Sequence, residues 1–318
     1  MSFTFFINNC TPSGGPGIFG NRLKKQFEKN GHVFVNPYST SQVPQKNISI
    51  IHGERIKGCP FNALRLDGLY FDSENPDNDK LNAPILKSFQ RENSDYIIYQ
   101  SEFSRDMYHA FMGERPFSII NNGIDQKEFL SNVKDLKTGH SVFSSYEKIC
   151  VASASWRRHK RLEEILEAFK SPKLEKVLLV VLGGFEYVKD KSTLSENVLL
   201  TPLFEPHQTS SIYSMADAMI HIAWLDWCPN TVVEALSCGT PVLCSHNGGT
   251  KELVKNDGVT IQLEEDYEIG TKVPLYNPPH VDTEILVEGI LEVLEKPKGF
   301  KRPDLDIETV ASNYEKYL

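Results

Sequence analysis

The chain has 318 residues, enough for two domains, because a soluble domain usually holds about 100–200 residues. Hydrophobic residues make up 40% and charged residues 24%, an ordinary globular composition that disfavours disordered and fibrous classes. The formal net charge of −8 disfavours a nucleic-acid partner, because duplex binding usually needs an excess of Lys and Arg.

Cysteine usage and the N-terminal segment indicate a cytoplasmic protein. The six cysteines form no CxxC pair and show no zinc-ligand spacing, so we interpret them as reduced thiols. Residues 1–7 lack a basic leader, and no run of about 18 apolar residues predicts a transmembrane helix. Arg22, Lys24, Lys25 and Lys29 give one helix a basic face, which would suit peripheral contact with a membrane, although such faces are more often simply solvated.

In the first half, strands alternate with a helix. Strand Phe3–Ile7, the Gly/Pro-rich loop Thr11–Gly20, helix Asn21–Asn30 and strand His32–Val35 form a βαβ unit, which indicates a parallel sheet. The polar segment Asp72–Lys80 predicts a surface loop. Further strands are predicted at Ile48–Ile51, Ala63–Leu66, Tyr96–Tyr99 and Phe117–Ile120.

The second half repeats this alternation after a polar, aperiodic stretch, Leu130–Tyr146, that predicts the linker between domains 1–137 and 138–302. Strands are predicted at Lys148–Ala152, Val177–Leu182, Val198–Leu200, Ala218–Ala223 and Pro241–Ser245. Helices are predicted from Leu162, and at Ser210–Ala216, Pro229–Cys238, Glu284–Leu294 and Ile307–Leu318.

This element order predicts an α/β fold with two doubly wound, Rossmann-like domains. Ligands of such domains bind beyond the carboxyl ends of the parallel strands. With two such domains facing each other, the cleft between them is the expected active site.

The run Asp226–Val242 carries the strongest chemical signal. Asp226 follows a strand, and Pro229–Thr231 open a helix whose free N–H groups suit an anion or a hydroxyl-rich ligand. Glu234 lies about one turn into that helix. The two carboxylates can therefore accept hydrogen bonds from a sugar and a ribose.

A basic turn, Ser153–Leu162, lies between a strand and a helix and contains Arg157, Arg158, Lys160 and Arg161. A departing nucleoside diphosphate needs fixed positive charge where its negative charge grows. Because it follows a strand end, we interpret the turn as an anion site rather than as a solvated loop.

Glycine pairs follow strands in both halves. Gly14–Gly17 comes after the first strand, and Gly248-Gly249 precedes a short helix, where glycines can cradle a phosphate or sugar. Neither matches a Walker loop or a GxGxxG fingerprint.

Together these segments resemble the family 4 glycosyltransferases of GT-B fold. The family signature is Glu, seven residues, a second Glu, and then an Ala-hydrophobic-small-Cys/Ala-Gly-x-Pro-Val run. Here Asp226 stands at the first acidic position, one methylene shorter than Glu. Gly31-His32-Val33, Tyr99–Ser104 and Asn121–Asp125 match further family landmarks, which mainly fix the fold.

The resemblance implies roles for residues of the second half. Asp226 would contact the transferred sugar, Cys228, Pro229, Asn230 and Thr231 would offer backbone amides, and Glu234 would hold the ribose. Lys160 would bind the diphosphate together with an Arg, for which we favour Arg157 over Arg158.

In the first half, Gly15 would approach the donor phosphates. Asp67 stands where relatives carry a His near the donor sugar, and His52 is the other candidate; both are expected on the acceptor side. The 303–318 helix would pack back toward the first domain, as in relatives. The Asp304-Leu305-Asp306 run resembles a metal motif of another glycosyltransferase fold, but it lies in a polar tail.

The implied activity is retaining transfer of a sugar from a nucleotide-sugar, UDP- favoured over GDP-, to a hydroxyl acceptor. The acceptor would be a growing glycan, a lipid-linked sugar or a glycoprotein. No metal or cofactor is expected, since Lys160 and an Arg would neutralise the leaving group. A nucleotide-sugar epimerase or hydrolase, an inactive sugar-nucleotide-binding protein and a DNA-glycosylating enzyme are the alternatives, and the oligomeric state is left open.

Overall fold

The computed structural model describes residues 2–11, 14–131, 133–136, 141–202, 204 and 206–318. The chain forms two compact units, and we describe each by itself. Unit 1 comprises Met1–Asp125, Glu268–Pro274 and Pro303–Leu318, and unit 2 comprises Gln126–Tyr267 and Leu275–Arg302. The predicted boundary between 137 and 138 lies outside the described residues, and the unit changes at Asp125–Gln126.

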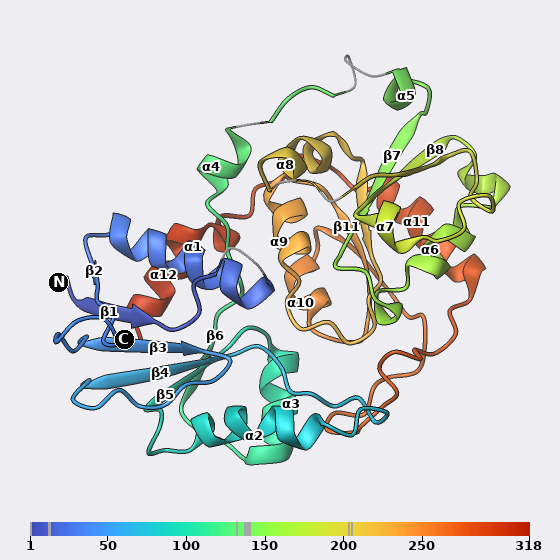
Figure 1. The fold of residues 1–318 in the computed structure, drawn as a ribbon. Coiled ribbons are helices and arrows are strands. Elements are labelled where there is room, and N and C mark those ends of the chain that lie inside the picture. Colours follow the sequence, from blue (N-terminus) through green and yellow to red (C-terminus); the bar gives the residue numbers. More distant parts are fainter. Residues whose placement is uncertain (1, 12–13, 132, 137–140, 203, 205) are drawn as a thin grey trace. The chain divides into compact units, whose positions relative to one another are not determined.

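Unit 1 contains a six-stranded parallel sheet in the order β2-β1-β3-β4-β5-β6 (Figure 1). The order reverses between β1 and β3, so the loops that follow these two strands meet at one edge of the sheet. The strands are β1 (Thr4–Ile7), β2 (Val33–Phe34), β3 (Lys46–Ile50), β4 (Phe61–Leu66), β5 (Tyr96–Tyr99) and β6 (Phe117–Ile119).

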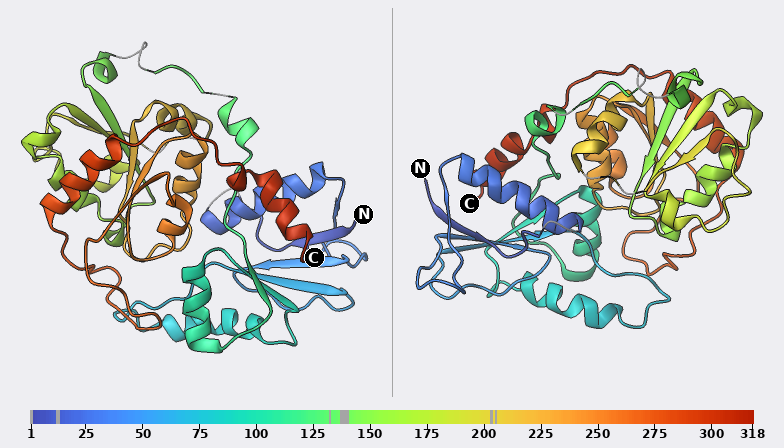
Figure 2. Two further views of the ribbon diagram at one scale, coloured as in Figure 1. Left: turned by 180° about the vertical axis from the view of Figure 1, so that it is seen from behind. Right: turned by 45° about the horizontal axis from the view of Figure 1, so that its top comes forward.

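Helices cover both faces of this sheet, α1 and α12 on one and α2 and α3 on the other (Figure 1). The helix α12 lies beside α1, where Tyr314 and Phe19 belong to one buried cluster (Figure 2). Asp306 caps α12 by accepting a 2.8 Å hydrogen bond from the Glu308 N–H, so the Asp304–Asp306 run has a capping role. The helices are α1 (Gly15–Lys29), α2 (Asn78–Phe89), α3 (Glu102–Met112), the 3-10 turn η3 (Pro303–Leu305) and α12 (Ile307–Glu315).

The predicted loop Thr11–Gly20 is wrong from Gly15 onward, because α1 begins there. Pro16 is tolerated in a first helical turn. Gly20 is present for close packing: a Cβ at this position would stand 1.9 Å from the Asn9 carbonyl oxygen. The glycines therefore let a helix approach the chain after β1, and they do not interrupt it.

Helices α2 and α3 were missed by the sequence analysis, and α2 begins inside the predicted surface loop Asp72–Lys80. Asp72 and Asn78 are buried, because Asp72 forms a β-bridge with Val273, which is distant in sequence. Ser101 caps α3 by accepting a hydrogen bond from the Ser104 N–H at 3.1 Å.

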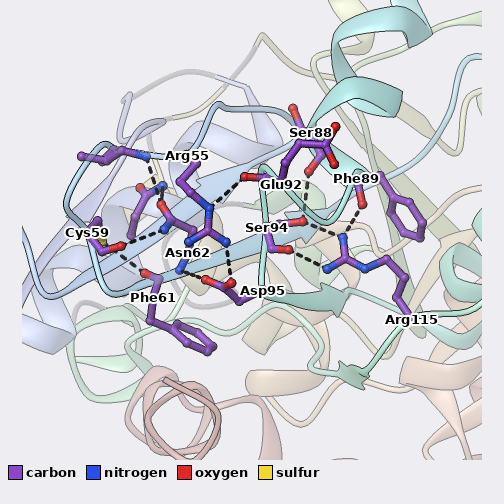
Figure 3. A network of polar contacts seen from close by, with 12 residues as sticks. Arg55, Cys59, Phe61, Asn62, Ser88, Phe89, Glu92, Ser94, Asp95 and Arg115 are labelled. Atoms are coloured by element: carbon purple, nitrogen blue, oxygen red, sulfur yellow. Dashed lines mark hydrogen bonds and ion pairs between the residues drawn. The ribbon is translucent and has the colours of Figure 1, made fainter.

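A polar network fixes the loops around the start of β4 and β5 (Figure 3). The Asp95 carboxylate pairs with Arg55 and accepts the Asn62 N–H at 2.8 Å. Arg115 donates to the Ser94 hydroxyl at 2.9 Å and to its carbonyl at 2.6 Å. This network lies at the amino ends of the strands and therefore stabilises the edge opposite to the one where ligands are expected.

Unit 2 contains a second six-stranded parallel sheet, in the order β12-β11-β10-β7-β8-β9. Counted within the unit, this is the Rossmann order 3-2-1-4-5-6, which reverses between β7 and β10. The strands are β7 (Lys148–Ser153), β8 (Val177–Leu182), β9 (Val198–Leu200), β10 (Ala218–His221), β11 (Val242–Ser245) and β12 (Gly258–Ile261). The prediction of two doubly wound parallel α/β domains is confirmed.

The unit 2 sheet is also covered on both faces, by α6 and α11 on one and by α8, α9 and α10 on the other (Figure 1). Every residue of β8 is buried, as expected for a central parallel strand. The longer helices are α8 (Pro206–Met215), α9 (Asn230–Ser237) and α11 (Thr283–Leu294). The shorter ones are α4 (Gln126–Leu130), α5 (Ser141–Ser144), η1 (Arg158–Lys160), α6 (Leu162–Ala168), η2 (Pro172–Leu174), α7 (Gly184–Tyr187) and α10 (Thr250–Val254).

Part of the predicted linker is attached to unit 2. Gln126, at the start of α4, donates to the Arg302 carbonyl at 2.7 Å, and the Ser211 hydroxyl accepts the Lys134 N–H at 2.9 Å. Within the described ranges, no helix is both long and apolar enough to span a bilayer.

Candidate functional site

The carboxylate of Asp226 is the centre of a polar cluster at the carboxyl edge of the unit 2 sheet. Its Oδ2 forms an ion pair with the Lys160 ammonium and lies 3.0 Å from Nε2 of His221. Its Oδ1 accepts the Trp227 N–H at 2.9 Å. Lys160 follows β7 and Asp226 follows β10, so the reversal of strand order brings these two predicted residues together.

The electrostatics of this cluster keep Asp226 ionised. Burial by itself would raise the pKa of the Asp226 carboxyl, but the Lys160 ammonium and the His221 hydrogen bond hold that pKa well below its usual range. Burial also lowers the pKa of His221, although the hydrogen bond to Asp226 and the Asp226 charge act to raise it. Because a carboxylate only accepts hydrogen bonds, the neutral His221 ring donates its Nε2–H to Asp226.

The backbone around Asp226 is fixed by the loop that follows β11. The Gly249 N–H donates to the Asp226 carbonyl at 2.8 Å. Gly248 has φ 85°, and a Cβ there would stand 2.8 Å from the same carbonyl oxygen. Only glycine suits this left-handed position so close to another backbone, which accounts for Gly248.

The basic turn separates its arginines. Arg158 forms a forked ion pair with Glu164, with nitrogen–oxygen distances of 2.9 and 2.6 Å, which raises the pKa of Arg158. The neighbouring Arg157 is exposed. Trp156 connects the turn to the end of β8, because its indole N–H donates to the Leu182 carbonyl at 2.7 Å. Arg157 therefore remains available to an anion, whereas Arg158 is already held.

His159 sits on the buried side of the turn. Its carbonyl accepts the Trp224 N–H at 2.8 Å, which ties the turn to the chain after β10. Burial, followed by the charge of Lys160, lowers the pKa of His159 to about 3. The ring is therefore neutral at physiological pH.

The helix α9 begins at the expected place. Pro229 precedes it and accepts the Val232 and Val233 N–H groups at 3.1 and 3.2 Å. Asn230 and Thr231 form the first turn, which is partly exposed, while Cys228 is buried. Pro229 has no N–H, so among the four predicted amide positions it can only shape the turn.

Glu234 is the fifth residue of α9 and is partly exposed. It belongs to the same helix N-terminal region as Asn230 and Thr231, about one turn further in. Its role in holding a ribose stays a prediction.

Gly15, His52 and Asp67 belong to unit 1. Gly15 is the first residue of α1, and His52 is exposed after β3, where its carbonyl accepts the Asn8 amide at 2.6 Å. These two positions follow the strands at which the unit 1 sheet reverses, β1 and β3.

Asp67 follows β4, and its carboxylate pairs with the fully buried Arg65. The Asp67 carbonyl accepts the Gln100 amide at 2.9 Å and the Ser104 hydroxyl at 2.8 Å. The Arg65 guanidinium also stacks 4.5 Å above the Phe19 ring. Asp67 therefore has structural partners in addition to its predicted role on the acceptor side.

His221 and Glu264 were missed by the sequence analysis. His221 is a polar residue at the end of an otherwise apolar buried strand, and this was the available signal. Glu264 forms a buried ion pair with Arg161, at 2.8 Å. No pattern in the sequence indicates that pairing, because the two residues are far apart in the chain.

Two further observations bear on ligands. Among the described residues, no group of three or more His, Cys, Asp and Glu side chains is placed to hold a metal ion. A pocket of about 660 Å³ on unit 1 is lined by Leu86, Phe89 and Met112 among others. No predicted site residue lines that pocket, so we give the polar cluster around Asp226 precedence over it.

Comparison with known proteins gives matches in sequence and in fold. A family model described as glycosyl transferases group 1 matches residues 134–302, more than half of the chain. The alpha-monoglucosyldiacylglycerol synthase of Streptococcus pneumoniae is 24% identical over 69% of this chain, a match that spans only 53% of that relative's own length. The N-acetyl-alpha-D-glucosaminyl L-malate synthase of Bacillus anthracis is 23% identical over 78% of this chain and 80% of its own.

Solved structures with the same fold include a sucrose-phosphate synthase from Thermosynechococcus elongatus. This structure matches with a TM-score of 0.70 at 12% identity, and the match covers 99% of this chain and 97% of the synthase chain. HepE from Anabaena, solved with UDP and glucose, has a TM-score of 0.65 at 13% identity and covers 99% of this chain and 98% of its own. At these identities the structural matches establish the GT-B fold alone.

Proposed function

Because this chain belongs to the group 1 glycosyltransferases, we propose that it moves a sugar from a nucleoside diphosphate-sugar to a hydroxyl group, with retention of anomeric configuration. We propose UDP over GDP as the nucleotide, in keeping with HepE, which was solved with UDP and glucose. The observation that carries the proposal is the meeting of Lys160 and Asp226 where the unit 2 sheet reverses.

Unit 2 would hold the donor. The Lys160 ammonium and the exposed Arg157 guanidinium would bind the diphosphate, while Asp226 would accept hydrogen bonds from sugar hydroxyls. The first-turn N–H groups of α9 add hydrogen-bond donors near the same edge. Since Arg158 is already held by Glu164, its position supports Arg157 as the diphosphate ligand.

The proposed reaction breaks the bond from the anomeric carbon to the phosphate oxygen and forms one to the acceptor oxygen on the same face. The acceptor proton passes to the departing phosphate oxygen, so no side chain has to act as a strong base. Lys160 and Arg157 stabilise the negative charge that grows on the leaving diphosphate. We propose that these cations take the role that a divalent metal plays in other transferases.

Lys160 must exchange partners when donor binds, because in the structure its ammonium pairs with Asp226. Both side chains keep partial exposure, 15% for Lys160 and 12% for Asp226, so a ligand can reach them. A bound diphosphate would draw the ammonium toward itself and leave the Asp226 carboxylate to the sugar, with His221 still donating to it.

The acceptor class is a proposal: a glycan, a lipid-linked sugar or a glycoprotein. The names of the two curated relatives mention diacylglycerol and malate, which are molecules of different kinds. Asp67 and His52 remain our candidates on the acceptor side. Because Asp67 pairs with Arg65, its replacement should affect stability as well as any acceptor contact.

We also propose a cytoplasmic location. On the basic face of α1, Lys24 pairs with Glu28 at 3.6 Å and Lys29 hydrogen-bonds to Asp125 at 2.5 Å. These neighbouring acids reduce the positive charge that a membrane surface would meet, so contact with a membrane is the weaker part of the proposal.

The proposal is tested by incubating the purified protein with UDP- and GDP-sugars, alone and with candidate acceptors, in the presence and absence of EDTA. We expect acceptor-dependent release of nucleoside diphosphate that persists in EDTA and gives an α-linked product from an α-linked donor. Free sugar or an epimer formed from donor alone would instead identify a hydrolase or epimerase. Binding without turnover would identify an inactive binding protein.

A further inference from the structure

Arg161 has a backbone conformation that rarely suits its side chain. It lies between η1 and α6, directly after Lys160, with φ 59° and ψ 41°. This is the left-handed region, which costs energy for any residue with a Cβ and is usually occupied by glycine or asparagine. A residue with a Cβ stays in this conformation when the surrounding structure holds it there.

The contact that holds Arg161 is a buried ion pair. Nη1 of Arg161 lies 2.8 Å from Oε2 of Glu264, and the two side chains are 0% and 3% exposed. Nη2 of Arg161 also donates to the Pro279 carbonyl at 3.3 Å. Burial lowers the pKa of Arg161, and the Glu264 carboxylate opposes that shift and supports the charged form.

Glu264 connects this turn to the loop after β11. Its other oxygen, Oε1, accepts hydrogen bonds from the Ser245 hydroxyl at 3.1 Å and from the Asn247 amide at 3.0 Å. Asn247 is itself fixed, since its Oδ1 accepts the Tyr267 N–H at 2.9 Å. One carboxylate therefore joins the turn after β7 to the loop after β11.

The loop after β11 in turn supports Asp226. Its Gly249 N–H donates to the Asp226 carbonyl at 2.8 Å, and Gly248 packs against the same backbone. A continuous path thus leads from the residue after Lys160, through Glu264 and Asn247, to the backbone of Asp226. This path lies alongside the direct ion pair between Lys160 and Asp226.

We propose that Arg161 and Glu264 are positioning residues that hold Lys160 and Asp226 at the separation needed to bind one diphosphate-sugar. We call this pair the Arg161–Glu264 clasp. The left-handed conformation of Arg161 sets the direction in which the chain leaves Lys160, and the buried pair keeps that conformation in place. The inference rests on the proposed function, because it assigns Lys160 to the donor diphosphate.

Three variants separate positioning from stability. Glu264→Gln keeps the shape of the side chain and an oxygen for Ser245 and Asn247, but it removes the charge facing Arg161. The double variant Arg161→Gly/Glu264→Gln removes both buried charges and places glycine at the left-handed position. Asp257→Asn is the control, because it removes the charge from a partly buried pair with Arg302, 3.2 Å apart, before β12 and away from the carboxyl edge.

Each variant is made with Lys160 intact and with Lys160→Ala, and its Tm and its Kd for UDP are measured by thermal melting and calorimetry. With Lys160 intact, Glu264→Gln should weaken UDP binding about tenfold. In the Lys160→Ala background the same substitution should weaken UDP binding by less than about twofold, because the effects of coupled residues are not additive. The double variant should regain Tm relative to Glu264→Gln without regaining affinity. Asp257→Asn should lower Tm and leave Kd unchanged.

The positioning role of the Arg161–Glu264 clasp is refuted if Glu264→Gln weakens UDP binding equally with Lys160 and with Lys160→Ala. It is also refuted if the double variant regains affinity for UDP together with Tm. GDP replaces UDP as the probe if GDP alone raises the Tm of the wild type. A wild type that binds neither nucleotide would overturn the proposed function itself, an outcome distinct from additivity, and the inference would fall with it.

Discussion

The two sheets carry ion pairs of similar composition at their carboxyl edges, but the cations of the two pairs differ in access to solvent. In unit 1, Arg65 is fully buried beneath Asp67, stacks on Phe19 and hydrogen-bonds to Gln100 at 3.0 Å. In unit 2, Lys160 and Asp226 both keep partial exposure. The Arg65 charge is satisfied by protein groups, whereas the Lys160 ammonium can exchange its protein partner for a ligand.

The difference lies in what surrounds each cation. Arg65 lies within β4 and is enclosed by neighbouring strands and α1, so its charge must be satisfied by protein groups. Lys160 lies on a turn beyond the end of β7, where the sheet no longer covers it. Substitutions at the two pairs should therefore separate stability from ligand binding.

The largest expected effect is on stability, in the Arg65→Met variant. Removal of this cation leaves the partly buried Asp67 carboxylate without its ion pair, and breaking a buried ion pair typically costs about 3–5 kcal/mol. Chemical denaturation should show that loss in the free energy of unfolding. A variant as stable as the wild type would show that the Arg65 pair is not needed for folding.

Lys160→Ala should affect activity more than stability. Loss of a group that stabilises the leaving diphosphate should lower kcat/KM by about 10²-fold, because removing one such electrostatic contact typically costs 10²–10³ in rate. The Tm should fall less than in Arg65→Met, since His221 and the Trp227 N–H still donate to the Asp226 carboxylate. Steady-state kinetics and thermal melting check the two parts, and near-normal turnover would refute the assigned role.

Acid should destabilise unit 2 through its buried histidines. Burial holds the pKa of His159 at about 3 and also lowers the pKa of His221, so both bind protons more readily when unfolded. Above about pH 6.5 the histidines are neutral in both the folded and the unfolded state. As the pH falls from there toward the folded pKa, the unfolded state binds protons first, so the free energy of unfolding decreases.

For one such histidine the expected loss between pH 7 and pH 5 is about 2 kcal/mol. Denaturation of the wild type and of His159→Phe at both pH values measures it, and the variant should lose less stability than the wild type. An equal pH dependence in the two proteins would show that His159 does not carry the effect.

The smallest effect concerns the two arginines of the basic turn. Arg157→Ala should weaken binding of the donor nucleotide about tenfold, because an exposed cation near a diphosphate contributes about one charge-assisted hydrogen bond. Arg158→Ala, whose side chain is held by Glu164, is the matched control and should change Kd by less than about twofold. Calorimetry with UDP measures both, and the reverse order would exchange their roles.

The fold class, and the meeting of Lys160 and Asp226 at one edge of a sheet, could be predicted from the sequence because they follow from the order of strands and helices. Lys160 and Asp226 each lie in the segment that follows an apolar strand, and doubly wound topology brings such segments to one edge. The roles of Gly15, His52, Asp67 and Glu234 stay predictions, because they depend on a bound ligand.

Other features could not be predicted, because they depend on residues distant in sequence. Asp72 is buried by its bridge to Val273, and Glu264 by its pairing with Arg161. The start of α1 was misplaced because Gly17 and Gly20 resemble loop residues, although they provide room for the chain after β1. Such contacts are specified by tertiary packing and leave no periodic pattern in the sequence.

The most direct test of the account is a calorimetric titration of UDP into the wild type, Lys160→Ala and Arg158→Ala. We predict saturable binding to the wild type, affinity at least about tenfold weaker for Lys160→Ala, and nearly unchanged affinity for Arg158→Ala. Equal affinity for the wild type and Lys160→Ala would contradict the placement of the donor diphosphate at the carboxyl edge of the unit 2 sheet.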